Sequence, residues 1–266
     1  MKALVVLAVL VAGFVMVFFA LRPAPPAPPA LLPGAAGSTA LPSRASSTPA
    51  PVSSKGLTPA WPPARDTAPT PAADLFAANY YVVFDGSGSM NEQGCSGGDT
   101  KIRVAKSALV AFARSVPAQA NLGLQVFDAS GVRERLPLGT GNRDQFMRLV
   151  NEVRANAGTP LRQAVGQAYV KLQEQGAKQL GYGEYHLVIV TDGQADAGQD
   201  PTPEVNRLLN ESPVVVQTIG FCIGTKHSLN QPGRTIYRAA DNAQELTQGL
   251  AEVLAEAPQF AVTQFK

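Results

Sequence analysis

The chain has 266 residues, a net charge of +2 and no block of lysine or arginine. A protein that binds nucleic acid normally carries a basic stripe, so this composition argues against a nucleic-acid partner. The length allows one domain of ordinary size together with additional segments.

An uncharged apolar run of 19 residues extends from Ala3 to Leu21. As a helix it comes close to spanning the roughly 30 Å of bilayer hydrocarbon, whereas a cleaved signal peptide has a shorter apolar core of about 7–15 residues. We therefore expect residues 1–21 to be a transmembrane anchor, with a removed signal peptide as the alternative. Single N-terminal anchors often act as export signals, so we expect a single-pass membrane protein whose domain is extracytoplasmic, in the periplasm or at the cell surface.

A segment rich in Pro, Ala and Ser follows over residues 22–76, where 14 of the 22 prolines fall between Pro23 and Pro71. Such a segment buries little apolar surface and favours extended polyproline II structure, with a reach on the order of 150 Å. It is expected to be a linker. Trp61 is isolated among prolines, so we expect it to be exposed.

The segment 77–257 alternates between strand-like apolar runs and helical patterns, as a globular domain does. Strands are expected near 79–85, 121–128, 132–137, 185–191, 214–221 and 235–238. Helices are expected near 101–116, 142–153, 160–175, 203–210 and 243–256. Residues 258–266 form a C-terminal tail that is too short to span a membrane.

This alternation predicts an α/β fold, doubly wound, with a mainly parallel sheet and helices on both faces. One antiparallel edge strand is expected at 132–137, because the short turn Ala129-Ser130-Gly131 precedes it. In open sheets of this kind ligands bind at the carboxyl ends of the strands, where the strand order reverses.

Oxygen-bearing side chains gather at that predicted edge. Three of them lie in Asp85-Gly86-Ser87-Gly88-Ser89, after an apolar strand; the others are Thr159 and Asp192, in Gly-Thr-Pro-Leu and Thr-Asp-Gly. Each motif alone also suits a turn or a helix cap. Together they suit a hard cation such as Mg²⁺, which prefers oxygen ligands.

The three motifs, in this order, resemble a von Willebrand factor type A domain carrying a complete metal-ion-dependent adhesion site (MIDAS), of the bacterial membrane-anchored type. The resemblance covers about residues 78–257 and implies a Rossmann-like fold. It also implies that Ser87 and Ser89 bind the metal directly, and that Thr159 is a ligand whose binding depends on the conformation of the domain. Asp85 and Asp192 would act largely through water. Mg²⁺ is the expected ion, with Mn²⁺ and Ca²⁺ as alternatives.

Neutral hydroxyl ligands leave much of a cation's charge unbalanced, so an Asp or Glu from a protein partner can complete the coordination. The expected function is a membrane-tethered, Mg²⁺-dependent adhesion or scaffold module. An accessory subunit of a system for membrane complex assembly or cofactor maturation is the alternative. Other acidic residues near the site are expected to be solvated; they are Glu92, Asp99, Asp196 and Asp200.

Enzymatic activity is not expected. Met90 occupies the last position of what would be a Gly-x-Ser-x-Gly elbow, and no Walker sequence is present. Phosphotransferases with an aspartyl-phosphate typically place a second carboxylate two residues after the nucleophile, where Ser87 stands. The two histidines, His186 and His227, have no partners at zinc spacing and are expected to be structural or exposed.

Cys95 and Cys222 are the only cysteines, and both are expected near the carboxyl ends of the strands, where the metal site is predicted. In an exported domain two such cysteines suggest a disulfide, which would restrain the loop beside the site. Two free thiols are the alternative.

Overall fold

A computed structural model describes residues 60–255. Its strands are β1 (Ala78–Asp85), β2 (Asn121–Asp128), β3 (Gly131–Gly139), β4 (Glu184–Thr191), β5 (Val215–Phe221) and β6 (Ile236–Ala240). Its helices are α1 (Lys101–Ser115), α2 (Arg143–Glu152), α3 (Leu161–Lys178), α4 (Thr202–Glu211) and α5 (Ala243–Ala255), with a single 3-10 turn, η1 (Gly88–Asn91).

The six strands form one sheet in the order β3-β2-β1-β4-β5-β6. All neighbouring pairs are parallel except β2 and β3, which are antiparallel. This confirms the predicted α/β fold with one antiparallel edge strand. The strand order reverses between β1 and β4. On one side of β1 the sheet is extended by β2 and β3, and on the other side by β4, β5 and β6.

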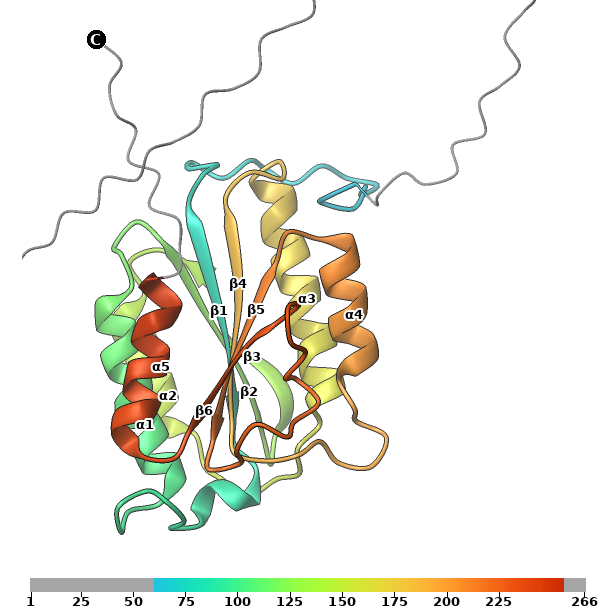
Figure 1. Ribbon diagram of the computed structural model, residues 1–266. Coiled ribbons are helices and arrows are strands. Elements are labelled where there is room, and N and C mark those ends of the chain that lie inside the picture. Colours follow the sequence, from blue (N-terminus) through green and yellow to red (C-terminus); the bar gives the residue numbers. More distant parts are fainter. Residues whose placement is uncertain (1–59, 256–266) are drawn as a thin grey trace, which may run out of the picture. The chain divides into compact units, whose positions relative to one another are not determined.

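Helices cover both faces of the sheet: α1, α2 and α5 pack on one face, and α3 and α4 on the other (Figure 1). Alternate side chains of β1 supply the two cores, with Tyr80, Val82 and Phe84 on the first face and Tyr81 and Val83 on the second. Burial on both faces explains why the central strands read as unbroken apolar runs. Edge strand β3 is only partly buried, which agrees with its mixed sequence.

The residues before β1 include the end of the expected linker, and they pack against the domain. Trp61 is half-buried, stacks on Tyr169 with ring centroids 6.3 Å apart and meets Tyr185 edge-on at 5.2 Å. The backbone N–H of Ala72 donates to the carbonyl of Lys178 at 2.8 Å. The expectation that Trp61 is exposed is therefore wrong, because an aromatic surface on α3 and β4 offers it a packing site.

Tyr185 lies at the start of β4, so this packing site is at the end of the sheet opposite to the carboxyl ends of the parallel strands. The predicted anchor at 1–21, most of the linker and the tail at 258–266 lie outside the described residues. Among the helices of residues 60–255, none is long and apolar enough to cross a membrane.

Candidate metal centre

The carboxyl ends of β1 and β4 lie side by side, since Phe84 pairs with Val190 in the parallel register. Asp85 ends β1 and is fully buried, and Asp192 directly follows β4 and is 3% exposed. The Thr191 hydroxyl donates to Asp85 Oδ2 at 2.5 Å. Two loops far apart in the sequence are thus joined at the point where the strand order reverses, as predicted for a ligand site in an open sheet.

The loop after β1 directs its serine hydroxyls toward Asp192. The backbone N–H of Ser87 donates to Asp85 Oδ1 at 2.7 Å, which folds the loop back over the end of its strand. The Oγ atoms of Ser87 and Ser89 lie 3.0 Å apart, and Ser89 Oγ donates to Asp192 Oδ1 at 2.8 Å. Gly86 permits this fold, because a Cβ there would lie 2.7 Å from the carbonyl oxygen of Phe127.

This donor set can be tested against the needs of Mg²⁺. The ion takes six oxygens at about 2.0–2.1 Å, which places neighbouring ligands about 2.9 Å apart. The 3.0 Å between the two serine hydroxyls and the 2.8 Å from Ser89 Oγ to Asp192 Oδ1 both match the edge of such an octahedron. The two serine hydroxyls are therefore spaced as two neighbouring ligands of a small hard cation would be, with a carboxylate close behind them.

Thr159 comes from a third loop, immediately before α3. Its Oγ1 and the Oγ of Ser89 both approach Gly193, lying 3.5 and 3.6 Å from the position a Cβ would take there. The loop is bound to the 86–88 segment, where the N–H of Gly88 donates to the carbonyl of Ala157 at 2.8 Å. All five residues predicted as site residues are consequently brought to one edge of the sheet.

Asp196 fixes the position of Thr159, which the sequence did not reveal. Its Oδ2 accepts the backbone N–H of Thr159 at 2.8 Å, and its own N–H donates to the carbonyl of Thr159 at 3.1 Å. A Cβ on Gly158 would lie 2.3 Å from that carboxylate oxygen, so glycine is needed beside this contact. Asp196 is exposed, as expected of a solvated loop residue, and its bonds to the Thr159 backbone are an additional role that was not expected.

Burial raises the pKa of Asp85 to about 6, opposed by the hydrogen bonds from Ser87 and Thr191 and reinforced by the nearby charge of Asp192. A carboxylate that is removed from water in this way is poorly neutralised by its own surroundings. A cation close to it would favour its charged form.

Lys101 is a further unpredicted member of the site. Its Nζ donates to Asp192 Oδ2 at 2.9 Å and to Glu92 Oε2 at 3.0 Å, while its side chain is only 7% exposed. Burial lowers the pKa of Lys101, but hydrogen bonds and charge from Asp192 and Glu92 outweigh it, so the pKa is raised overall. Glu92 is 67% exposed, as expected of a solvated residue, and is in addition an ion-pair partner beside the candidate metal site.

The family of the chain follows from this arrangement and from a match over most of its length. A family model for the von Willebrand factor type A domain matches residues 79–265. The chain belongs to the von Willebrand factor type A domain family.

Several proteins resemble this von Willebrand factor type A domain. The uncharacterized protein YwmD of Bacillus subtilis (strain 168) is 27% identical over 189 residues, which cover 64% of this chain and 82% of YwmD. The crystal structure of the pilus adhesin SpaC from Lactobacillus rhamnosus GG matches with a TM-score of 0.54 at 14% identity, covering 69% of this chain and 31% of SpaC.

A second solved structure carries a metal. Proximal thread matrix protein 1 from the mussel byssus, with a zinc-occupied MIDAS motif, matches with a TM-score of 0.53 at 16% identity, covering 67% of this chain and 47% of that one. At these identities both structures show a shared fold, and the chain spans less than half of either.

Within residues 60–255 no group of three or more His, Cys, Asp and Glu residues is arranged to hold a metal. The candidate centre of this type A domain is instead built mainly from hydroxyls, with two carboxylates behind them. A site of this composition favours hard cations and leaves them incompletely neutralised.

His227 secures the Asp192 loop from the other side. Its Nδ1 accepts the N–H of Leu229 at 3.0 Å, so Nε2 carries the proton and donates to the carbonyl of Gly193 at 3.0 Å. Burial lowers the pKa of His227, against a smaller opposing effect of that carbonyl. His227 therefore has a structural role, which is one of the two roles expected for it.

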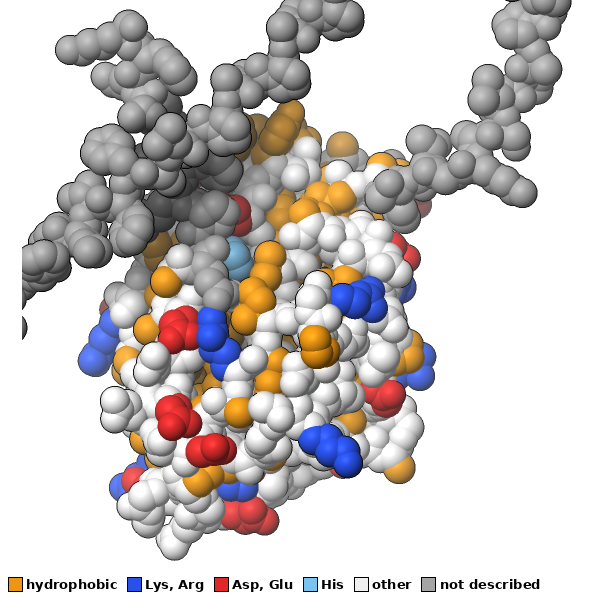
Figure 2. Space-filling view, viewed as in Figure 1, with side chains coloured by type: hydrophobic (Ala, Val, Ile, Leu, Met, Phe, Trp, Pro, Cys, Tyr) orange, Lys and Arg blue, Asp and Glu red, His pale blue; other side chains and the backbone are white. Residues whose placement is uncertain are grey.

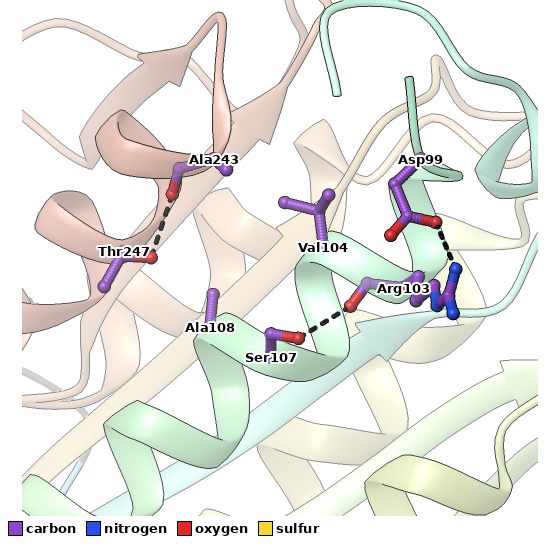
Figure 3. A pocket seen from close by; sticks show the side chains of 7 residues that line it. All are labelled: Asp99, Arg103, Val104, Ser107, Ala108, Ala243 and Thr247. Atoms are coloured by element: carbon purple, nitrogen blue, oxygen red, sulfur yellow. Dashed lines mark hydrogen bonds and ion pairs between the residues drawn. The ribbon is translucent and has the colours of Figure 1, made fainter. Parts of the chain in front are cut away.

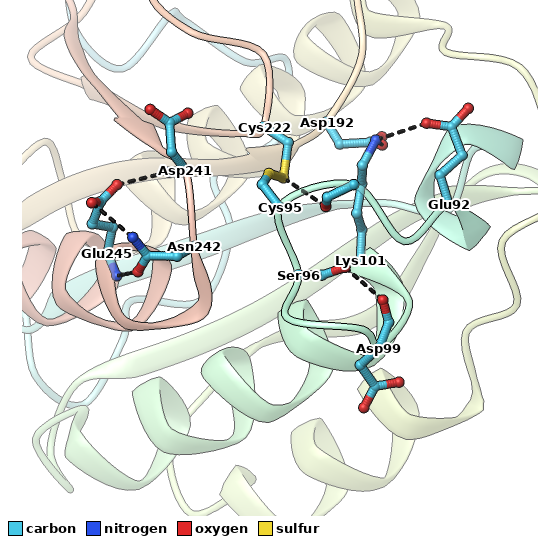
Figure 4. Close-up of a disulfide and its surroundings, with 11 residues drawn as sticks. Glu92, Cys95, Ser96, Asp99, Lys101, Asp192, Cys222, Asp241, Asn242 and Glu245 are labelled. Atoms are coloured by element: carbon cyan, nitrogen blue, oxygen red, sulfur yellow. Dashed lines mark hydrogen bonds and ion pairs between the residues drawn. A yellow bond between two sulfur atoms is a disulfide. The ribbon is translucent and has the colours of Figure 1, made fainter.

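A disulfide joins Cys95 and Cys222 across the same edge, with Cα atoms 6.1 Å apart (Figure 4). It ties the loop between η1 and α1 to the residue that follows β5. Both cysteines have left-handed backbone conformations, with φ of 43° and 64°. The disulfide thereby restrains the loop that carries Glu92 and leads into Lys101.

Two other surface features show a different chemistry from the metal edge. A groove of about 260 Å³ lies between α1 and α5, but its charged pair, Asp99 and Arg103, is mutually bound at 3.0 Å and its remaining lining is small and mostly apolar (Figure 3). On the face drawn in Figure 2, Lys and Arg side chains are scattered and form no continuous patch. Neither feature offers a metal site or a basic stripe.

Proposed function

We propose that this chain is a membrane-tethered, Mg²⁺-dependent protein-binding module that captures an Asp or Glu of a partner at a complete MIDAS. The observation that carries the proposal is the octahedral spacing of neutral hydroxyls at the open edge of the sheet: Ser87 Oγ and Ser89 Oγ at 3.0 Å. Ser87 and Ser89 would be direct ligands of the ion. Thr159 would be a further ligand from the loop before α3, and Asp85 and Asp192 would act largely through water.

The chemistry of these residues favours adhesion. Mg²⁺ supplies a positive charge and retains exchangeable positions, and the hydroxyls around it add no negative charge. A carboxylate of another protein is therefore the natural additional ligand. SpaC is described as a pilus adhesin and the byssus protein has a metal in its MIDAS motif, which is consistent with this use of the fold.

Binding rather than catalysis is proposed because, among residues 60–255, neither serine hydroxyl is hydrogen-bonded to a histidine. Ser87 Oγ faces Ser89 Oγ, and Ser89 Oγ donates to Asp192. His227 donates its Nε2 proton to a backbone carbonyl and is used on Nδ1 as well, so both of its nitrogens are engaged away from the hydroxyls. A nucleophilic serine is usually activated by a histidine, and the carboxylate of Asp192, which is paired with Lys101, is a much weaker base.

The first described residues pack at the end of the sheet opposite to the candidate metal site. The chain reaches the domain at the packing site of Trp61, opposite to Asp85 and Asp192. An extracytoplasmic position is supported by the disulfide between Cys95 and Cys222, since disulfides persist mainly in oxidising compartments.

The test is affinity capture with the full chain in detergent, from solubilised membranes and extracts of the source cells, in Mg²⁺ and in EDTA. We expect partners that are retained only in Mg²⁺ and are lost with Ser87→Ala and Ser89→Ala. Blocking the carboxyl groups of the extract by carbodiimide-coupled amidation should abolish the same capture. Ser130→Ala is the matched control, because Ser130 is an exposed serine at the carboxyl end of β2.

Capture that is equal in Mg²⁺ and EDTA, or that survives both Ser87→Ala and Ser89→Ala, would contradict the proposal. Capture that depends on Mg²⁺ but survives amidation would exclude a partner carboxylate.

A further inference from the structure

Lys101 occupies a position that the helix itself does not favour. It is the first residue of α1, where the helix dipole presents partial positive charge and an ammonium group is destabilising. Its side chain is 7% exposed, although lysine is almost never buried unless it is paired. The interactions of its ammonium group, rather than helix formation, therefore account for its position.

The ammonium group meets the face of Asp192 that is turned away from the serines. Asp192 Oδ1 accepts the hydroxyl of Ser89 at 2.8 Å. Its Oδ2 accepts Lys101 Nζ at 2.9 Å, and Figure 4 shows Lys101 between Asp192 and Glu92. One carboxylate thus bridges a candidate metal ligand and a fixed positive charge. The negative charge of Asp192 is partly neutralised by Lys101, which reduces the attraction of Asp192 for a cation held by the serines.

Glu92 completes the arrangement from solvent. Its Oε2 lies 3.0 Å from Lys101 Nζ, and its side chain is 67% exposed. The backbone also joins the two residues, because the N–H of Lys101 donates to the carbonyl of Glu92 at 2.9 Å. Glu92 therefore competes with Asp192 for the same ammonium group, and it is the partner more strongly screened by water.

We propose that Lys101 is a positioning residue that sets the charge of the metal site. It neutralises Oδ2 of Asp192, which weakens cation binding by the free domain. A bound divalent cation then stays positive enough to attract a partner's carboxylate. The inference rests on the proposed function, since it concerns the same site. The buried charges behind the serines are two carboxylates, Asp85 and Asp192, and one ammonium group; the exposed carboxylate of Glu92 is screened by water and is left out of the sum. Their sum is −1, so a divalent cation there retains a net charge of +1.

The test is Mn²⁺ binding by the full chain in detergent, measured through the electron paramagnetic resonance signal of the ion that remains free. With Lys101→Met we expect the dissociation constant for Mn²⁺ to fall on the order of tenfold, because a nearby positive charge is removed. Lys101→Arg keeps the charge and should bind Mn²⁺ within about threefold of the wild type. Lys106→Met is the matched control, since Lys106 lies on the same helix and, within the described part of the chain, its Nζ bonds only the carbonyl of Asn151.

A second readout has the opposite sign. Acetate serves as the carboxylate probe and displaces water from protein-bound Mn²⁺, which lowers the water-proton relaxivity. At saturating Mn²⁺, Lys101→Met should require several times more acetate than the wild type for the same decrease. Tighter metal binding combined with weaker acetate binding is not expected from a residue whose role is only to stabilise the fold.

Glu92→Gln provides a variant at an exposed side chain, so its folding is secure. With Glu92 neutral, Lys101 pairs with Asp192 alone, and the dissociation constant for Mn²⁺ should rise. In a double-mutant cycle the effect of Glu92→Gln should largely disappear in the Lys101→Met background, because the two residues act through one ammonium group.

The outcomes separate this inference from the proposed function. A wild-type chain that binds no divalent cation overturns both. A wild-type chain that binds Mn²⁺, with an unchanged dissociation constant in folded Lys101→Met or with additive effects in the cycle, overturns the role of Lys101 and leaves the metal site standing.

Discussion

The hydroxyl of Thr191 donates a hydrogen bond of 2.5 Å to Oδ2 of Asp85, joining the last residue of β4 to the last residue of β1. Both residues are fully buried. This contact fixes the direction of the Asp85 carboxylate, whose other oxygen accepts the N–H of Ser87. The geometry of the serine hydroxyls therefore depends on a residue that touches neither of them.

Thr191→Val should lower the free energy of unfolding by about 1.5–3 kcal/mol, because a buried carboxylate loses a hydrogen bond while the shape of the side chain is kept. Urea unfolding in EDTA measures this without a metal contribution. Thr218→Val is the control: Thr218 is fully buried in β5, and within residues 60–255 its hydroxyl has no hydrogen-bond partner. That variant should be neutral or slightly stabilised, and equal losses in the two variants would contradict the role of Thr191.

Reduction of the disulfide should lower the free energy of unfolding by about 2–5 kcal/mol. The bond spans 127 residues of sequence, so it restricts the unfolded chain strongly. Urea unfolding with and without dithiothreitol measures the loss. A variant with both Cys95→Ser and Cys222→Ser should show the lower stability at the outset and no response to the reductant. A wild-type chain whose unfolding midpoint ignores the reductant would be inconsistent with a closed disulfide.

Trp61→Ala should destabilise the domain by about 1–3 kcal/mol through loss of its half-buried contacts with Tyr169 and Tyr185. Phe76→Ala is the matched control, because Phe76 is an aromatic residue of the same segment that is 73% exposed. Its effect should stay within about 0.5 kcal/mol. Thermal unfolding followed by circular dichroism distinguishes the two, and equal effects would mean that the Trp61 contacts are not stabilising.

The sequence predicted the sheet well because apolar periodicity and turn residues are local signals. The strand 121–128 was predicted with the bounds that the structure gives, and the antiparallel edge strand followed from its short turn. The five residues proposed for the site were singled out because they carry oxygen at strand ends or helix starts and occur in motifs that, in this order, resemble those of the family. Parallel strands then bring such positions to one edge.

What the sequence could not show are the contacts that depend on three-dimensional packing. Lys101 has no local sign of its role, since its partners Glu92 and Asp192 lie 9 and 91 residues away. Asp196 looked like a solvated loop residue because its bond to the Thr159 loop is likewise nonlocal. Trp61 was misjudged because its neighbouring prolines suggested a linker, whereas the aromatic surface that receives it comes from α3 and β4.

The contribution of His227 to the stability of the domain should decrease as the pH falls below about 6.5, whereas Asp85, whose pKa is raised to about 6, acts in the opposite direction over the same range. The pKa of His227 is lowered in the folded state, mainly by burial, so the unfolded chain binds the proton first as the pH falls. His227 thus contributes stability that is fully present above its unfolded pKa and is lost as the pH falls through its folded pKa. Urea unfolding between pH 8 and pH 5 should show the stability of the wild type falling relative to that of His227→Asn, in which Asp85 is unchanged, and parallel pH profiles would contradict this assignment.

The most direct test of the metal centre is isothermal titration of Mg²⁺ into the full chain, purified in EDTA and then freed of it. The wild type and Ser130→Ala should bind one ion, and Ser89→Ala should bind at least about tenfold more weakly, since its hydroxyl links Ser87 to Asp192. No binding by a folded wild-type chain, or equal binding by Ser89→Ala, would contradict a metal-dependent site at this edge of the sheet.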